Sequence, residues 1–113
     1  MKTPFYEYAI VTAARQSPEI ANLPKGAAVE KVTTYVLTAF DAGLTMEIGY
    51  DADNDAYGTG SSIATTGRKS HTLGAGVGHD ATARTAKAYV KGGTATVGRA
   101  FSVIEGYILP SSI

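Results

Sequence analysis

The sequence predicts an all-β protein, an antiparallel β-sandwich or jelly-roll that also carries a long glycine-rich loop. Three observations support this fold class: a composition rich in glycine, tyrosine, threonine and valine, short segments in which apolar and polar residues alternate, and turn residues between those segments. With 113 residues, 44% of them hydrophobic, the chain is expected to form one domain, residues 1–113, around a single core.

Four segments have the composition and spacing of long strands. The first is Phe5–Ala13. Val29–Phe40 has apolar residues at both alternating sets of positions, so we expect a central strand that is covered on both sides. Leu44–Tyr50 alternates most regularly, and Ala100–Leu109 forms the last strand, before Pro110. A further hairpin is expected where Lys91-Gly92-Gly93 separates residues 85–90 from residues 94–97.

Two segments lack a strand pattern. Residues 15–27 contain two prolines and are expected to form an extended connection or arm, with a single helical turn over Pro18–Ala21 as an alternative. Residues 51–80 are rich in glycine, serine and threonine and are expected to form the long loop, with a short helix over Ser61–Thr65 as an alternative. A loop of this length in a compact domain is expected to be functional or ordered against a partner.

The charge and cysteine content exclude several classes of function. Ten basic and ten acidic residues cancel, whereas binding to nucleic acid needs a clustered basic surface. The chain has no cysteine, which excludes disulfides, thiolate catalysis and cysteine-ligated zinc. No apolar stretch approaches the roughly 20 residues that span a bilayer. We therefore expect neither nucleic acid nor a membrane as a partner.

An acidic cluster is the first candidate for a binding site. Asp51, Asp53 and Asp55 alternate as in the opening of a calcium-binding loop. That pattern fails at Ala56, where the loop needs glycine, and at Ser62, where it needs a bidentate glutamate. An irregular cation site remains an alternative to the preferred interpretation, which is a solvated turn whose side chains cap backbone groups.

The two histidines, His71 and His79, are the second candidate. A metal site with Asp80 would need a spacing of two on a strand or four on a helix, and their spacing is eight. A hydrolase would pair a histidine with Ser70 and Asp80, but no nucleophile elbow surrounds any serine. The sequence thus predicts no catalytic residue, no cofactor-binding residue, no metal ligand and no cofactor, and the protein is expected not to be an enzyme.

The remaining motifs are weaker. Gly74–Gly78 lacks the preceding buried strand and the following helix of a phosphate-binding loop, so we expect a flexible loop. Arg68, Lys69, Arg84 and Lys87 are the nearest approach to a basic patch, and the last two are interpreted as the solvent-facing side of the predicted hairpin. Tyrosine is favoured in interfaces, and two or three of the seven are expected to face a partner. They occupy positions 6, 8, 35, 50, 57, 89 and 107.

Two segments resemble small virion proteins of tailed bacteriophages. In Val32–Asp53, a strand ending Thr-Ala-Phe is followed by a turn, a second strand ending in glycine, and an acidic loop, which is the order found in those proteins. Ala95–Ile108 is similar to their closing strand pair. Residues 1–28 and 58–80 show no such resemblance.

The resemblance implies a non-catalytic β-sandwich protein of the virion, assembled in the host cytoplasm. It implies a capsid decoration (cement) protein or a head-fibre-like protein, with a connector, tail or fibre component as an alternative. Its partners would be the major capsid protein or other virion subunits, and further copies of itself, for example in a trimer. The residues alone also permit a free β-sandwich module that binds a carbohydrate or a protein through tyrosines and the loop Asp51–Asp55.

Overall fold

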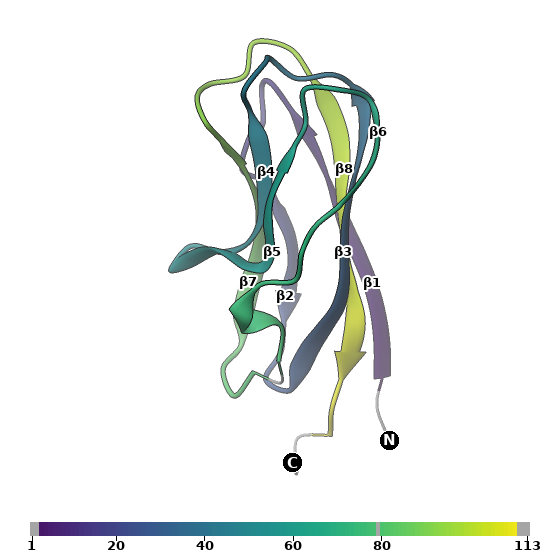
Figure 1. Cartoon of the computed structure of the whole chain (residues 1–113). Helices are drawn as coiled ribbons and strands as arrows, with labels where there is room; N and C mark the ends of the chain where they lie inside the picture. The colour runs from purple at the N-terminus through teal and green to yellow at the C-terminus, as the bar shows by residue number, and fades with distance from the viewer. Residues whose placement is uncertain (1–2, 79, 111–113) are drawn as a thin grey trace.

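The computed structural model describes residues 3–78 and 80–110 and confirms the predicted antiparallel β-sandwich. Two four-stranded sheets pack face to face in a body of 46 × 24 × 21 Å (Figure 1). The described residues contain no helix that is long and apolar enough to cross a membrane. Sheet A has the order β1 (Thr3–Thr12), β8 (Arg99–Ile108), β3 (Ala27–Thr38) and β6 (Gly67–Ser70), and sheet B the order β2 (Glu19–Leu23), β7 (Arg84–Lys91), β4 (Thr45–Tyr50) and β5 (Asp53–Ser62).

Strand β8 lies at the centre of sheet A. It pairs with β1 from Thr12↔Arg99 to Thr3↔Ile108, and on its other side it pairs with β3. Its alternate residues Ala100, Ser102 and Ile104 are fully buried between the sheets. The core is therefore built on one side of a long strand whose other side faces away from sheet B.

The four long strand predictions are confirmed, with ends that differ by at most two residues. In β3 the even-numbered apolar residues, such as Val32 and Val36, are buried, and Phe40 beyond the strand is buried with them. In the segment of β4, Leu44, Met46 and Ile48 are at most 3% exposed, as their alternation predicts.

The predicted arm at residues 15–27 is wrong, because Glu19–Leu23 forms β2 and pairs with β7. The helical turn over Pro18–Ala21 is wrong for the same reason. A register shift between Glu19 and Ala21 interrupts the ladder, so Ile20 and Leu23 both reach the core although they are three residues apart. This bulge removes the period of two by which a strand is recognised.

The predicted loop at residues 51–80 is wrong over much of its length. It contains β5, β6 and the short 3-10 helix η1 (Ala75–Val77), and β5 includes part of the proposed Ser61–Thr65 helix. The register between β4 and β5 shifts twice, and Ala56, Tyr57 and Gly58 are buried in succession. Consecutive burial leaves no alternating pattern in the sequence.

The predicted hairpin at residues 85–97 is also wrong. β7 forms as expected, but its partners are β2 and β4. Residues 94–98 form no strand and carry the chain from sheet B to sheet A. Asp41 holds this connection, since its carboxylate accepts hydrogen bonds from the backbone N–H groups of Thr96 and Val97 at 2.9 and 3.1 Å.

The glycine-rich segment Gly74–Gly78 packs directly on β5. The backbone N–H of Gly74 donates to the carbonyl of Tyr57 at 3.0 Å. A Cβ atom at Gly74 would stand 2.2 Å from the carbonyl oxygen of Asp55. Glycine is required here because two backbones approach too closely to admit a side chain, so the expected flexible loop is replaced by a tight backbone contact.

A chain of buried hydrogen bonds joins the two sheets through His71, which is 7% exposed. Its Nδ1 lies 2.7 Å from the carbonyl oxygen of Thr59 in β5 and must donate, because a carbonyl only accepts. Nε2 therefore accepts from the hydroxyl of Thr34 in β3 at 2.7 Å, and the Ser102 hydroxyl in β8 donates to Thr34 at 3.0 Å. Burial lowers the pKa of His71, outweighing the opposing effect of the Thr59 carbonyl.

We predict that Gly74→Ala destabilises the fold by about 1–3 kcal/mol, the usual cost of overpacking. Gly78→Ala is the matched control, because nothing lies within 4 Å of a Cβ at that position, and its effect should stay within about 0.5 kcal/mol. Urea unfolding monitored by circular dichroism measures both. Equal effects of the two substitutions would contradict the tight contact with β5.

We predict that stability falls as the pH drops below 6.5, the ordinary pKa of histidine. The unfolded chain binds a proton there, whereas the folded chain binds it only below the lowered pKa of His71. The stabilisation is thus complete above pH 6.5 and is lost as the pH falls through the folded pKa, by at most about 1.4 kcal/mol per pH unit.

His71→Gln keeps a donor and an acceptor but does not titrate, so its free energy of unfolding should change less between about pH 7 and about pH 5. The aspartates with shifted pKa values, Asp41, Asp51 and Asp53, are present in both proteins, so their contributions cancel in the comparison. Urea titrations across this range test the prediction, and parallel profiles for the two proteins would refute it.

Candidate functional site

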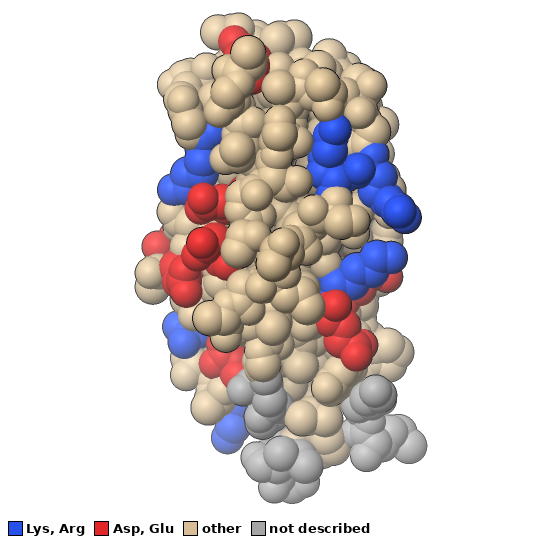
Figure 2. Space-filling model, in the orientation of Figure 1, with Lys and Arg blue, Asp and Glu red and all other residues tan. Residues whose placement is uncertain are grey.

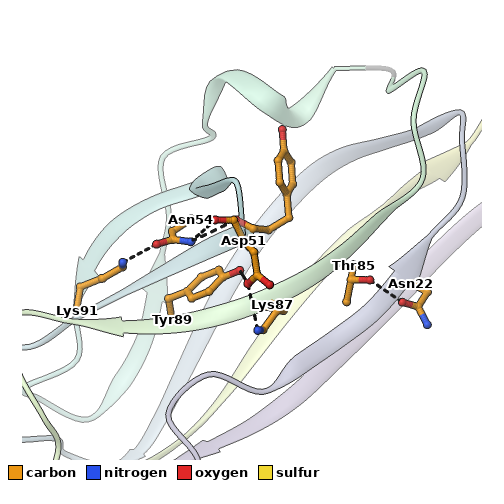
Figure 3. A network of polar contacts seen from close by, with 8 residues as sticks. Asn22, Asp51, Asn54, Thr85, Lys87, Tyr89 and Lys91 are labelled. Carbon is orange, nitrogen blue, oxygen red and sulfur yellow. Dashed lines mark hydrogen bonds and ion pairs between the residues drawn. The ribbon is translucent and has the colours of Figure 1, made fainter.

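The acidic cluster does not gather around a cation. Asp51 lies against the outer face of sheet B, where the Tyr89 hydroxyl donates to its carboxylate at 2.7 Å and Lys87 Nζ lies 3.1 Å away (Figure 3). These two contacts, first Tyr89 and then Lys87, lower the pKa of Asp51. Within residues 3–78 and 80–110, no three acidic or histidine side chains are placed to hold a metal ion.

The rest of the acidic turn is organised by Asn54. Its amide donates to the backbone carbonyls of Tyr50 and Asp51 at 3.3 and 3.4 Å, and it accepts from Lys91 at 2.5 Å. A hydrogen bond with Asp55 raises the pKa of Asp53, so these two carboxyl groups face each other. Asn54 therefore caps the backbone of the turn, in agreement with the preferred interpretation. Asp53 and Asp55, however, lie in β5 and not in a loop.

Tyr89 is the centre of this polar network on sheet B. Lys87 and Lys91 both lie with their Nζ atoms 5.7 Å from the centroid of its ring. Burial, followed by the hydrogen bond to Asp51, raises the pKa of the Tyr89 hydroxyl and keeps it a donor. The network holds the β4–β5 turn against β7, so the role of these residues is structural.

The histidine candidates supply no reactive group in the described residues. Both ring nitrogens of His71 are taken by Thr34 and Thr59, so this imidazole has no free position for Ser70 or for a metal. Asp80 forms an ion pair with Arg84 at 3.1 Å. His79 lies outside the described residues.

The four basic residues do not form one patch. Arg68 and Lys69 lie on β6 in sheet A, whereas Arg84 and Lys87 lie on β7 in sheet B, each beside an aspartate. Figure 2 shows basic and acidic side chains together on both flanks of the molecule, with a band of uncharged residues between them.

The outer face of sheet A carries the exposed tyrosines in an apolar central area. Arg68 on β6 lies beside Tyr35, and Lys31 and Glu105 lie together toward one end of this area. Tyr6 and Tyr8 on β1 are 59% and 56% exposed. Tyr8 packs edge-on against Phe101, with ring centroids 5.8 Å apart. The described residues form no third layer over this face. We call it the aromatic face and define it by Tyr6, Tyr8, Ile10, Tyr35, Phe101 and Val103.

The ladder sets out the aromatic face in rows. Phe101 stands between Ile10 on β1 and Tyr35 on β3, and Val103 stands between Tyr8 and Thr33. A shallow groove of about 280 Å³ runs between the tyrosines, with Val103 among its lining residues. The expectation that β3 is covered on both sides is thus wrong for the isolated chain, since sheet B covers one side only.

Thr33 adds a polar atom to this face. The residue is 2% exposed, and its hydroxyl has no hydrogen-bond partner in the part of the chain that the structure describes. An unpaired buried hydroxyl costs about 1–3 kcal/mol. It lies beside Val103, in the row next to Tyr35.

The prediction that two or three tyrosines face a partner is compatible with Tyr6, Tyr8 and Tyr35. The sequence did not show that they lie together. β1 and β3 are distant in the chain and are neighbours only through β8. The one indication of this surface in the sequence was therefore the second set of apolar residues in Val29–Phe40.

Comparisons with known proteins bear on the fold. No protein family model matches the chain, and no curated protein matches it. The fold matches a chain in the acidic stable capsid structure of Helicobacter pylori bacteriophage KHP30 with a TM-score of 0.68 and 17% identity, over 98% of this chain and 95% of that chain. It matches a chain of the cyanophage Pam1 capsid asymmetric unit with a TM-score of 0.70 and 21% identity, over 96% of this chain and 86% of that chain.

At these identities the likeness shows a shared fold. The resemblance predicted from Val32–Asp53 and Ala95–Ile108, to β-sandwich proteins of phage virions, is confirmed at that level.

Proposed function

We propose that the protein is a non-catalytic structural component of a phage virion, a capsid decoration protein that binds and stabilises neighbouring capsid subunits. The observation that carries this proposal is the match to chains in two phage capsid structures over nearly the whole length of this chain. Both matches also cover most of the other chain, so those chains are themselves little longer than one sandwich. A protein of that size fits an accessory role on a shell.

The surface of the molecule supports a binding role. A large exposed apolar patch on a small soluble domain marks an interaction site, and the aromatic face provides one. The zero formal charge removes the repulsion that would oppose many copies lying side by side on one particle. Many weak contacts made together then hold the protein to the shell by avidity.

The polar clusters support the absence of catalysis. Each of them has a structural use: His71 joins the sheets, Asp51 fastens a turn, and Asp80 pairs with Arg84. In this proposal the partners are the major capsid protein or other virion subunits and further copies of the chain. The protein resides in the virion after assembly in the host cytoplasm, with a connector, tail or fibre position as the alternative.

We predict that the purified chain co-sediments with capsid particles that lack it, reaches saturation at a fixed ratio to capsid subunits, and raises the temperature at which the particles break open. The same chain unfolded by heat is the control for non-specific adsorption. Sedimentation and light scattering during heating provide the two readouts.

Failure to bind particles, together with tight binding of a glycan, would contradict the proposal and support a free binding module.

A further inference from the structure

The outer side of β8 carries an ordered series of charges and apolar groups. This side carries Arg99, Phe101, Val103, Glu105 and Tyr107, which alternate with residues that point into the core. Phe101 is partly buried, and Val103 is only 3% exposed because its neighbours on this face cover it. The glutamate is six positions beyond the arginine, which places them about 20 Å apart along the strand. From Arg99 to Glu105 the series is therefore positive, then apolar, then negative, with Lys31 of β3 beside Glu105.

Such a series is complementary to itself. When two copies of β8 face each other and run in opposite directions, about an axis that passes near Ser102, Arg99 of each copy lies over Glu105 of the other. Phe101 then lies over Val103. A contact in which the same patch serves both partners is the kind that a two-fold axis produces.

The flanking strands fit the same arrangement. On β1, Tyr8 of one copy lies over Ile10 of the other, so apolar groups meet. On β3, Tyr35 of one copy lies over Thr33 of the other. In this arrangement the phenol of Tyr35 lies near the Thr33 hydroxyl of the other copy, which has no hydrogen-bond partner in the described part of its own chain.

The size of the face suits a dimer. Three neighbouring strands of about ten residues cover an area on the order of 500 Å² in projection, and more in accessible surface. A standard interface buries about 800 Å² on each partner. Pro4 on the edge strand β1 has no N–H group to extend the ladder, which disfavours pairing by the edge and leaves the face.

We infer that the aromatic face binds the same face of a second copy of this chain, forming a two-fold dimer with reciprocal Arg99–Glu105 contacts. The inference rests on the proposed function and names one of its partners, a further copy of the chain. The aromatic face is then buried in the dimer and capsid subunits are bound by other surfaces, of which a dimer offers two sets. The self-association itself does not depend on the presence of a capsid.

Sedimentation velocity over a concentration series tests the inference. Wild-type chain should be a dimer, whereas Arg99→Glu and Glu105→Arg should each dissociate at least tenfold more readily, because like charges then face each other. An equimolar mixture of the two variants should recover the dimer, since each copy supplies the charge that the other needs. The double variant Arg99→Glu/Glu105→Arg should also recover it.

Two control variants change the net charge of the chain by the same amounts as the test variants do. Lys25→Glu and Glu19→Arg lie on exposed positions away from the aromatic face, and both should remain dimeric. Circular dichroism confirms that each variant is folded. If a charge reversal fails to fold, Arg99→Gln and Glu105→Gln replace it, and each should weaken the dimer by itself.

A monomeric or trimeric wild-type chain, or a mixture no more associated than its components, would overturn the inference. A monomer that still binds capsids, and loses that binding with Arg99→Glu, would assign the face to a capsid subunit and leave the proposed function standing. A dimer that binds no capsid would keep the inference and refute the function.

Discussion

The register of β8 between β1 and β3 is the constraint on which the rest of the structure depends. Because side chains alternate along a strand, this register points Ala100, Ser102 and Ile104 into the core and turns Phe101 and Val103 to the outer side, where Val103 is covered by its neighbours. A slip of one residue would exchange the two sets and bury charges at both ends. Two ladders that run the length of β8 hold the register. The same pairing therefore creates the core and the aromatic face.

The strands that could be predicted are those with an unbroken period of two. Leu44–Tyr50 has one, and its apolar set is buried as expected. β2 and β5 could not be recognised, because register shifts against their partners destroy the alternation. Glycines in residues 51–80 were interpreted as loop residues, whereas Gly74 allows one backbone to rest on another. Composition alone does not separate these two uses of glycine.

The sequence predicted only part of the aromatic face, because its strands are distant from one another in the chain. The outer residues of β3 indicated a second apolar face, but their neighbours come from β1 and β8, which are distant in the chain. The link between Thr34 and Ser102 likewise spans 68 residues. Long-range pairing of this kind leaves no local pattern, so the sequence could identify the residues of a contact surface without assembling them.

The central claim is that the aromatic face is a contact surface between subunits, and hydroxyl-radical footprinting tests it most directly. As the chain is concentrated, Tyr6 and Tyr8 should become protected from oxidation. Leu73 and Val97, which are also exposed but lie off this face, should stay equally reactive. Protection of Leu73 or Val97 with unchanged reactivity of the two tyrosines would contradict the account.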